Sequence, residues 1–109
     1  MTTTGLSSVQ IQALREELEE QLQRRISQLE TLKDSAAGGT AAEMSWQDVQ
    51  IAQTATERAI AETRRCLEML DEGTYGRCAH CSATIPYERL KIRPLARYCI
   101  NCQRKREAA

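Results

Sequence analysis

The sequence predicts a mainly α-helical fold, in which an antiparallel coiled-coil helical hairpin is followed by a small cysteine-rich head with a short C-terminal helix. Three observations predict it. Two stretches, residues 7–34 and 48–72, place apolar side chains at steps of three or four, which is the spacing of one helix face. A glycine pair, Gly38 and Gly39, separates the two stretches, and four closely spaced cysteines follow them.

The first stretch contains neither proline nor glycine and carries one apolar side chain per helical turn. These side chains are Ile11, Leu14, Leu18, Leu22, Ile26, Leu29 and Leu32. Ser7 or Ser8 is a suitable N-cap. Because the apolar stripe is one residue wide and flanked by charge, as in a two-stranded coiled coil, this helix needs a partner helix.

A turn and a second helix follow. Small residues and the glycine pair are expected to stop the first helix, which places the hairpin tip at residues 35–47. Ser45 is an N-cap candidate, with Asp48 three residues later as an approximate capping box. The second helix is expected to end at Gly73 and to present a seam of mainly small or apolar residues: Val49, Ala52, Thr56, Ala59 or Ile60, Thr63, Leu67 and Leu70.

The short glycine-containing turn favours a hairpin within one chain, with each arm about 37 Å long. A plain dimeric coiled coil, or a bundle formed with other copies, is the alternative that the pattern leaves open. We divide the chain into a hairpin, residues 1–72, and a head with a basic tail, residues 73–109.

With 109 residues, 41% hydrophobic and 4% aromatic, the chain excludes a large multi-domain enzyme and predicts an elongated protein. No apolar run is long enough to cross a bilayer, and the first residues lack the pattern of a signal peptide, so we expect a cytoplasmic protein without a membrane partner. The net charge is zero, but residues 1–50 carry net −4, residues 51–76 net −2 and residues 77–109 net +6. An acidic stem therefore joins a basic head.

The four cysteines of the head form two Cys-x-x-Cys pairs separated by 17 residues: Cys78, Cys81, Cys99 and Cys102. In a chain whose thiols are kept reduced, this spacing is typical of a metal site. We expect one structural Zn²⁺, because four thiolates complete its tetrahedral shell and leave no position for water or substrate. An iron site of rubredoxin type and a redox-active dithiol pair are the alternatives.

Two further residues, His80 and Cys66, have side chains that could take part in chemistry. His80 lies between two of these cysteines, and we expect it to be exposed rather than a ligand. Cys66 lies in the second helix and is most simply a buried or half-buried small side chain. One histidine, a closed metal shell and the absence of a phosphate loop predict that the protein is not an enzyme.

From Gly73 to Cys102 the segment contains both cysteine pairs, a Gly-Thr-Tyr-Gly lead-in, an Ile-Pro-x-x-Arg-Leu segment and an Arg-Pro step. On these residues the chain resembles the four-cysteine zinc finger of the bacterial DksA/TraR family. The resemblance implies a transcription regulator that binds RNA polymerase directly: the hairpin enters the secondary channel, and its tip approaches the active site without enzymatic activity.

The resemblance also suggests contact residues. Better-known members carry an Asp-x-x-Asp-x-Ala motif at the tip, whereas this tip offers Glu43, Trp46 and Asp48 as polymerase-facing residues. Some relatives help to bind guanosine tetraphosphate. Arg93 matches a basic position used there, and Arg104 is a second possible nucleotide or polymerase contact.

Two other residues depart from the nucleotide-binding pattern. Glu62 and Gln103 stand where basic residues would be expected. A solvated basic face is the alternative interpretation of seven basic residues of the head, which are Arg89, Lys91, Arg93, Arg97, Arg104, Lys105 and Arg106.

The alternative function is a zinc-finger adaptor that binds nucleic acid or another protein. The basic head favours it. Aromatic residues are not interleaved with basic ones, and the acidic stem would repel a duplex, so direct DNA binding is not expected.

Overall fold

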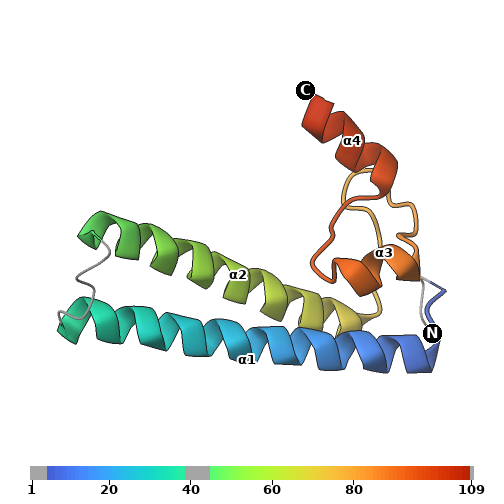
Figure 1. Ribbon diagram of the computed structural model, residues 1–109. Helices are drawn as coiled ribbons and strands as arrows, with labels where there is room; N and C mark the ends of the chain where they lie inside the picture. Colours follow the sequence, from blue (N-terminus) through green and yellow to red (C-terminus); the bar gives the residue numbers. More distant parts are fainter. Residues whose placement is uncertain (1–4, 39–44, 109) are drawn as a thin grey trace.

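The structure is a computed structural model that describes residues 5–38 and 45–108. Two long antiparallel helices, α1 (Ser8–Gly38) and α2 (Trp46–Glu72), form the hairpin. The head carries two short helices, α3 (Tyr87–Ile92) and α4 (Ile100–Ala108), and packs beside the base of the hairpin (Figure 1). The described residues contain no strand, only an isolated antiparallel bridge between Arg77 and Thr84.

The molecule is elongated, as the composition predicts. Its extents are 50 × 34 × 19 Å and its radius of gyration is 16.7 Å, whereas a compact domain of this length would have a radius of about 13 Å. Among the described residues, none of the helices combines the length and apolar character that crossing a bilayer requires.

A reciprocal pair of hydrogen bonds caps the start of α1. The backbone N–H of Gln10 donates to Ser7 Oγ at 3.1 Å, and the backbone N–H of Ser7 donates to Gln10 Oε1 at 3.0 Å. This is a capping box with glutamine in the third helical position. It identifies Ser7 as the N-cap of α1.

The predicted end of the first helix, residue 34, is wrong, because α1 continues through Gly38. The turn-like composition that suggested an early end includes two alanines, Ala36 and Ala37, which have the highest helix propensity of any residue. One glycine at the last position costs the helix little. Residues 39–44 of the predicted tip lie outside the described residues.

The caps of α2 are those that the sequence predicts. Ser45 Oγ accepts a 3.0 Å hydrogen bond from the backbone N–H of Asp48, so α2 begins at Trp46, two residues before the predicted start. At the other end Gly73 has φ 78°, in the left-handed region where glycine is favoured. The hairpin therefore ends at Gly73, as predicted.

Small and polar side chains of α2 form much of the seam with α1. Thr56 and Thr63 are buried, and their hydroxyls donate to the carbonyls of Ala52 (2.8 Å) and Ala59 (2.7 Å) one turn earlier. These bonds satisfy both hydroxyls within the helix, so neither threonine needs a polar partner across the seam. Cys66, rather than the predicted Leu67, is buried at the next turn.

The main core lies where the hairpin base meets the head. Leu14 and Leu18 of α1 pack in one cluster with residues from α2 and the head. From outside α1 the cluster contains the buried residues Leu6, Cys66, Leu70, Tyr75, Cys78, Ile85, Leu90 and Cys102. One side of α1 is therefore covered by α2 and the head together.

We expect Leu18→Ala to lower the free energy of unfolding by about 2–5 kcal/mol, because Leu18 is fully buried and its truncation leaves a cavity between hairpin and head. Val9→Ala, at an exposed position on the same helix, should change it by no more than about 0.5 kcal/mol. Urea denaturation of the zinc-loaded proteins measures both. Equal losses for the two variants would contradict this description of the core.

Candidate metal centre

Two backbone turns bring the four cysteines of the head together. Cys78 and Cys81 lie in the turn after Arg77, and Cys99 and Cys102 lie at the start of α4. The four sulfur atoms all lie within 4.8 Å of one another. Among the described residues this is the one cluster of at least three cysteine, histidine or acidic side chains that could hold a metal ion.

Backbone hydrogen bonds shape the first turn and join it to the loop before the second. The N–H of Cys78 donates to Ala83 at 2.8 Å, and the N–H of Ser82 donates to Cys78 at 3.0 Å. Ser82 has φ 63°, a left-handed conformation that tightens this turn. The N–H of Ala79 donates to the carbonyl of Arg97 at 2.7 Å, which ties the first turn to the chain just before Cys99.

The sulfur geometry fits zinc. Tetrahedral coordination with Zn–S bonds of about 2.3 Å places neighbouring sulfurs about 3.8 Å apart. Cys81 Sγ and Cys99 Sγ, which belong to different turns, are 3.7 Å apart. Four thiolates complete the coordination shell, so this is a structural zinc site, with each turn supplying two ligands.

The electrostatics of the cluster favour a divalent cation. Burial works against ionisation of Cys78, but backbone N–H groups of the two turns, chiefly that of Cys81, lower its pKa to about 5. Burial and hydrogen bonds to the neighbouring sulfurs raise the pKa of Cys102 to about 12. The protein groups alone therefore do not stabilise four thiolates together. A bound zinc ion supplies the missing positive charge and displaces the remaining protons.

Comparison with known proteins identifies this head. Residues 73–108 match the family described as the prokaryotic dksA/traR C4-type zinc finger. The zinc finger of this chain is thus similar to those of the DksA/TraR family. The resemblance seen in the sequence is thereby confirmed, and so is the structural zinc.

Two curated relatives match part of the chain. An uncharacterized protein of Aquifex aeolicus (strain VF5) is 42% identical over 43 residues, which are 39% of this chain and 30% of that protein. General stress protein 16O of Bacillus subtilis (strain 168) is 41% identical over 44 residues, 40% of this chain and 27% of that protein. The matched segment thus spans less than a third of either relative's length.

The fold likeness extends to the hairpin. The solved structure of transcription factor DksA2 from Pseudomonas aeruginosa superposes with a TM-score of 0.83, covering 94% of this chain and 86% of that one at 22% identity. The mainly α-helical fold, with its hairpin, zinc-finger head and C-terminal helix, is therefore that of a DksA-type protein.

The remaining head and hairpin residues singled out in the sequence are not part of the metal cluster. His80 is exposed. Cys66 is buried beside the cluster in the common core, and burial, followed by the charge of Glu62, raises the pKa of its thiol to about 11. Both positions agree with the expectations from the sequence.

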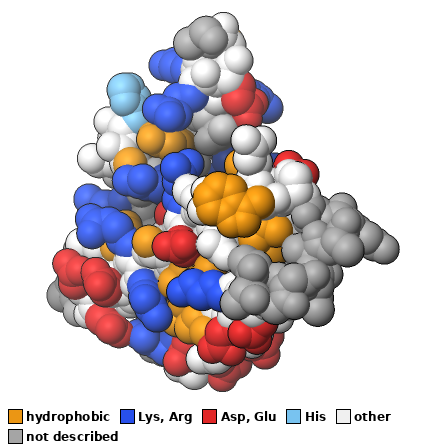
Figure 2. All heavy atoms as spheres, turned by 90° about the vertical axis from the view of Figure 1, so that its left-hand side faces the viewer, with side chains coloured by type: hydrophobic (Ala, Val, Ile, Leu, Met, Phe, Trp, Pro, Cys, Tyr) orange, Lys and Arg blue, Asp and Glu red, His pale blue; other side chains and the backbone are white. Residues whose placement is uncertain are grey.

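The predicted tip residues are exposed where the structure describes them. Trp46 is the first residue of α2 and 66% exposed. Asp48, in the first turn of α2, is also exposed, and Glu43 lies outside the described residues. Figure 2, which views the hairpin from its tip, shows acidic side chains gathered over its lower part and basic ones above, toward the head.

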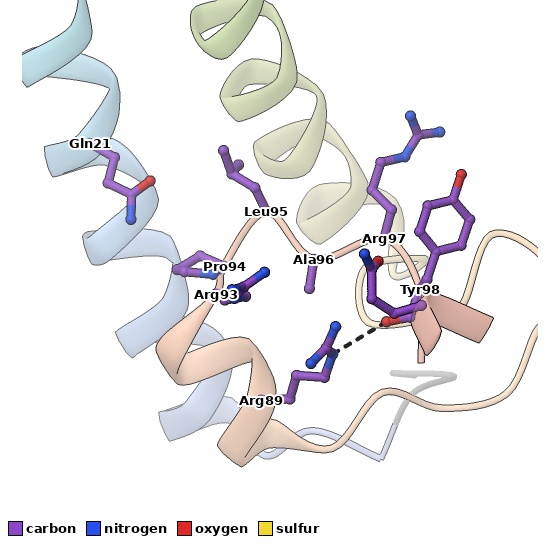
Figure 3. A pocket seen from close by; sticks show the side chains of 9 residues that line it. Gln21, Arg89, Arg93, Pro94, Leu95, Ala96, Arg97 and Tyr98 are labelled. Atoms are coloured by element: carbon purple, nitrogen blue, oxygen red, sulfur yellow. Dashed lines mark hydrogen bonds between the residues drawn. The ribbon is translucent and has the colours of Figure 1, made fainter. Parts of the chain in front are cut away.

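The two basic residues suggested as contacts are separated in the structure. Arg93 lines a cavity of about 400 Å³ between α1 and the finger, together with Arg89 and Arg97, whereas Arg104 is exposed on α4 outside it. Figure 3 shows this cavity, in which Arg89 Nε donates to the carbonyl of Tyr98 at 3.3 Å. Glu62 lines a different cavity.

Sequence reasoning missed one contributor to this cavity, Gln21 of α1. It lies some 70 positions before the finger arginines in the sequence, and nothing in its local pattern distinguishes it from the other glutamines of α1. Only the packing of the head on α1 brings it there.

We expect Cys102→Ser to abolish stoichiometric zinc binding, because it removes one of four ligands and the head depends on the metal to fold. Cys66→Ala should retain one zinc ion per chain, since Cys66 is not in the cluster. Metal analysis after gel filtration measures the stoichiometry. Loss of zinc from the Cys66 variant, with its helical content intact, would contradict this ligand assignment.

The raised pKa of Cys66 predicts slow alkylation. Its thiol remains protonated at all pH values well below about 11, and only the thiolate reacts rapidly. In the zinc-loaded protein at pH 8, iodoacetamide should modify Cys66 at least tenfold more slowly than in the denatured chain. Mass spectrometry of the modified peptide gives the rate, and equal rates in the two states would contradict burial of the thiol.

Proposed function

We propose that this protein is a zinc-binding transcription regulator that binds bacterial RNA polymerase directly through its secondary channel and modulates initiation without enzymatic activity. The observation that carries the proposal is the likeness of nearly the whole chain to a protein described as a transcription factor, combined with a finger of the same family. What the two comparisons support together is the architecture: a long helical hairpin followed by a head with four clustered cysteines.

The shape of the hairpin supports entry into a channel. With 31 residues, α1 is about 46 Å long, and the hairpin is only two helices wide. The head lies to one side of the hairpin base and leaves the tip half of both arms free (Figure 1). A rod of these dimensions can reach a deep site while the head stays at the channel entrance.

The tip offers groups that could act at such a site. The carboxylate of Asp48 forms no hydrogen bond or ion pair with any described residue, because the cap of α2 uses its backbone N–H instead. A carboxylate is a natural ligand for magnesium or for the water molecules around it. We propose Asp48 and Trp46, with Glu43, as the polymerase-facing residues of the tip.

The cavity around Arg93 supports a contact at the base. Three arginine side chains line it, and a cavity of this charge suits a phosphate or a carboxylate. We propose Arg93 as a contact to the polymerase or to guanosine tetraphosphate, and Arg104 as a further contact on α4. Glu62 and Gln103 would weaken binding of guanosine tetraphosphate, since neither supplies the positive charge expected at its position.

Competitive binding tests the proposal. The zinc-loaded chain is titrated with bacterial RNA polymerase in the presence and absence of a known secondary-channel factor, with duplex DNA alone as the control. Displacement by that factor is the expected result. Absence of polymerase binding, or salt-sensitive binding to DNA alone, would favour the adaptor function instead.

We expect Asp48→Asn to change transcript yield from a responsive promoter at least threefold while leaving polymerase affinity within twofold of the unmodified chain. The substitution removes one charge, and the backbone cap is unaffected. Glu68→Gln, an equally exposed change of charge near the base of α2, is the matched control and should alter neither quantity. In vitro transcription measures the yield, and identical yields for both variants would exclude a role for Asp48.

A further inference from the structure

A segment between α3 and the second cysteine turn carries two arginines of the cavity beside α1. We call this segment, residues 93–98, the arginine loop. Arg93 and Arg97 belong to it, and both line the cavity of about 400 Å³ (Figure 3). The loop lies between α3 and α4 and is part of neither helix. Helical hydrogen bonds therefore do not fix its conformation.

Backbone hydrogen bonds within the head hold the two ends of the arginine loop. At its start the N–H of Arg93 donates to the carbonyl of Arg89 at 2.8 Å, and the N–H of Ala96 donates to the carbonyl of Arg93 at 2.9 Å. Toward its end the carbonyl of Arg97 accepts from the N–H of Ala79 at 2.7 Å. The partners in these bonds all belong to the head. The bonds thus shape the loop without attaching it to the hairpin.

One side chain crosses from the end of the hairpin to the middle of the loop. The hydroxyl of Tyr75 donates to the carbonyl of Pro94 at 2.7 Å, although the two residues are 19 positions apart. Tyr75 is 3% exposed, and Pro94 is also buried. Burial, and then the neighbouring Cys66, raises the pKa of Tyr75 above its usual range. The phenol therefore keeps the proton that it donates.

The last turn of α2 holds the backbone of Tyr75. The N–H groups of Thr74 and Tyr75 donate to the carbonyl of Met69 at 2.9 and 3.2 Å, directly after the cap at Gly73. The ring itself is part of the core that the hairpin shares with the head. Tyr75 is thus fixed to α2 by its backbone and to the arginine loop by its hydroxyl.

We propose that Tyr75 is a positioning residue for the contact made by Arg93: its hydroxyl fixes the arginine loop against the end of α2, so that the guanidinium has a defined place relative to the hairpin. The proposal rests on the proposed function, in which Arg93 contacts the polymerase or guanosine tetraphosphate. A partner that takes the hairpin and the arginine together needs both in register. Directional contacts of an arginine are lost with small displacements.

A purely structural role of the hydroxyl is the alternative. A buried carbonyl without a partner costs stability, so loss of the Tyr75 hydroxyl also destabilises the head. A loss of stability does not depend on the side chain of Arg93, whereas positioning of that side chain does. The two roles are therefore separated by asking whether the effect of the tyrosine requires the arginine.

A double-mutant cycle on polymerase affinity makes this distinction. N-terminally labelled, zinc-loaded full-length chains carrying Tyr75→Phe, Arg93→Ala or both are titrated with RNA polymerase core and followed by fluorescence anisotropy. We expect each single substitution to weaken binding at least fivefold. In the Arg93→Ala background, Tyr75→Phe should weaken binding less than twofold further, because the group that it positions is already absent.

Tyr87→Phe is the matched control. Tyr87 is half-buried and packs against the same core, and its hydroxyl forms no hydrogen bond with any described residue. The same chemical change at this position should leave polymerase affinity within twofold of the unmodified chain. Metal analysis and circular dichroism verify that each variant is zinc-loaded and helical before titration.

Amide hydrogen exchange reports on the loop in the free protein. Tyr75→Phe should speed exchange of the Ala96 N–H at least tenfold, because the turn that this N–H closes loses its attachment to α2. The N–H of Ser82, which closes the first cysteine turn, should exchange within twofold of its rate in the unmodified chain. Unchanged exchange at Ala96 would show that the hydroxyl does not hold the loop.

The titrations can overturn the proposal in distinguishable ways. If Tyr75→Phe weakens binding equally with and without the Arg93 side chain, the hydroxyl acts only on stability, and the proposed function stands. If Tyr75→Phe binds within twofold of the unmodified chain, the hydroxyl has no part in the contact, and the proposed function again stands. If the unmodified chain does not bind the polymerase, the proposed function fails and the positioning role with it.

Discussion

The zinc ion that joins the two cysteine turns is the interaction on which the placement of the head depends. Two isoleucines of the head, Ile92 and Ile100, are exposed, and the head relies on a core that it shares with α1 and α2. Structural zinc sites contribute on the order of 10 kcal/mol to folding, which is comparable to the whole stability of a small domain. The same ion fixes the start of α4 relative to the first turn, and the core fixes α3 on α1.

The hairpin follows from a different constraint. The apolar stripe on α1 is buried at Leu14 and Leu18, near the base, and its residues toward the tip, Leu22, Ile26, Leu29 and Leu32, are half-buried. Small and threonine side chains of α2 allow close approach along the hairpin, and the head adds Leu90 at the base. Arg15 and Asp71 link the two arms there with a 2.8 Å ion pair. The head therefore lies beside the base of the hairpin (Figure 1).

Much of this could be predicted from the sequence, because the relevant signals are local. Helix periodicity, the caps at Ser7, Ser45 and Gly73, and the spacing of the cysteines each depend on residues within a few positions of one another. The end of α1 could not be placed, since the helix propensity of two alanines competes with the turn signal of the glycines. The position of Gln21 in the cavity and the exposure of Ile92 could not be predicted either, because both depend on how the head packs on α1.

The finger and the hairpin have separate parts in the proposed function. The finger matches a family of zinc fingers, and the arginines of the cavity beside α1 offer a contact surface at the base of the hairpin. The start of α2 carries the exposed Trp46 and Asp48, whose carboxylate is not used by the helix cap. This division explains why the chain combines an acidic stem with a basic head while its net charge is zero.

In the proposed function, the hairpin enters the polymerase while the zinc-bound head remains at the rim of the channel. A cryo-electron microscopy map of the zinc-loaded chain with RNA polymerase tests it most directly. We expect density for α1 and α2 inside the secondary channel, with the first turn of α2 pointing toward the catalytic magnesium and the finger against the outer surface. A hairpin that lies outside the channel, or a finger bound to the nucleic acid instead, would contradict it.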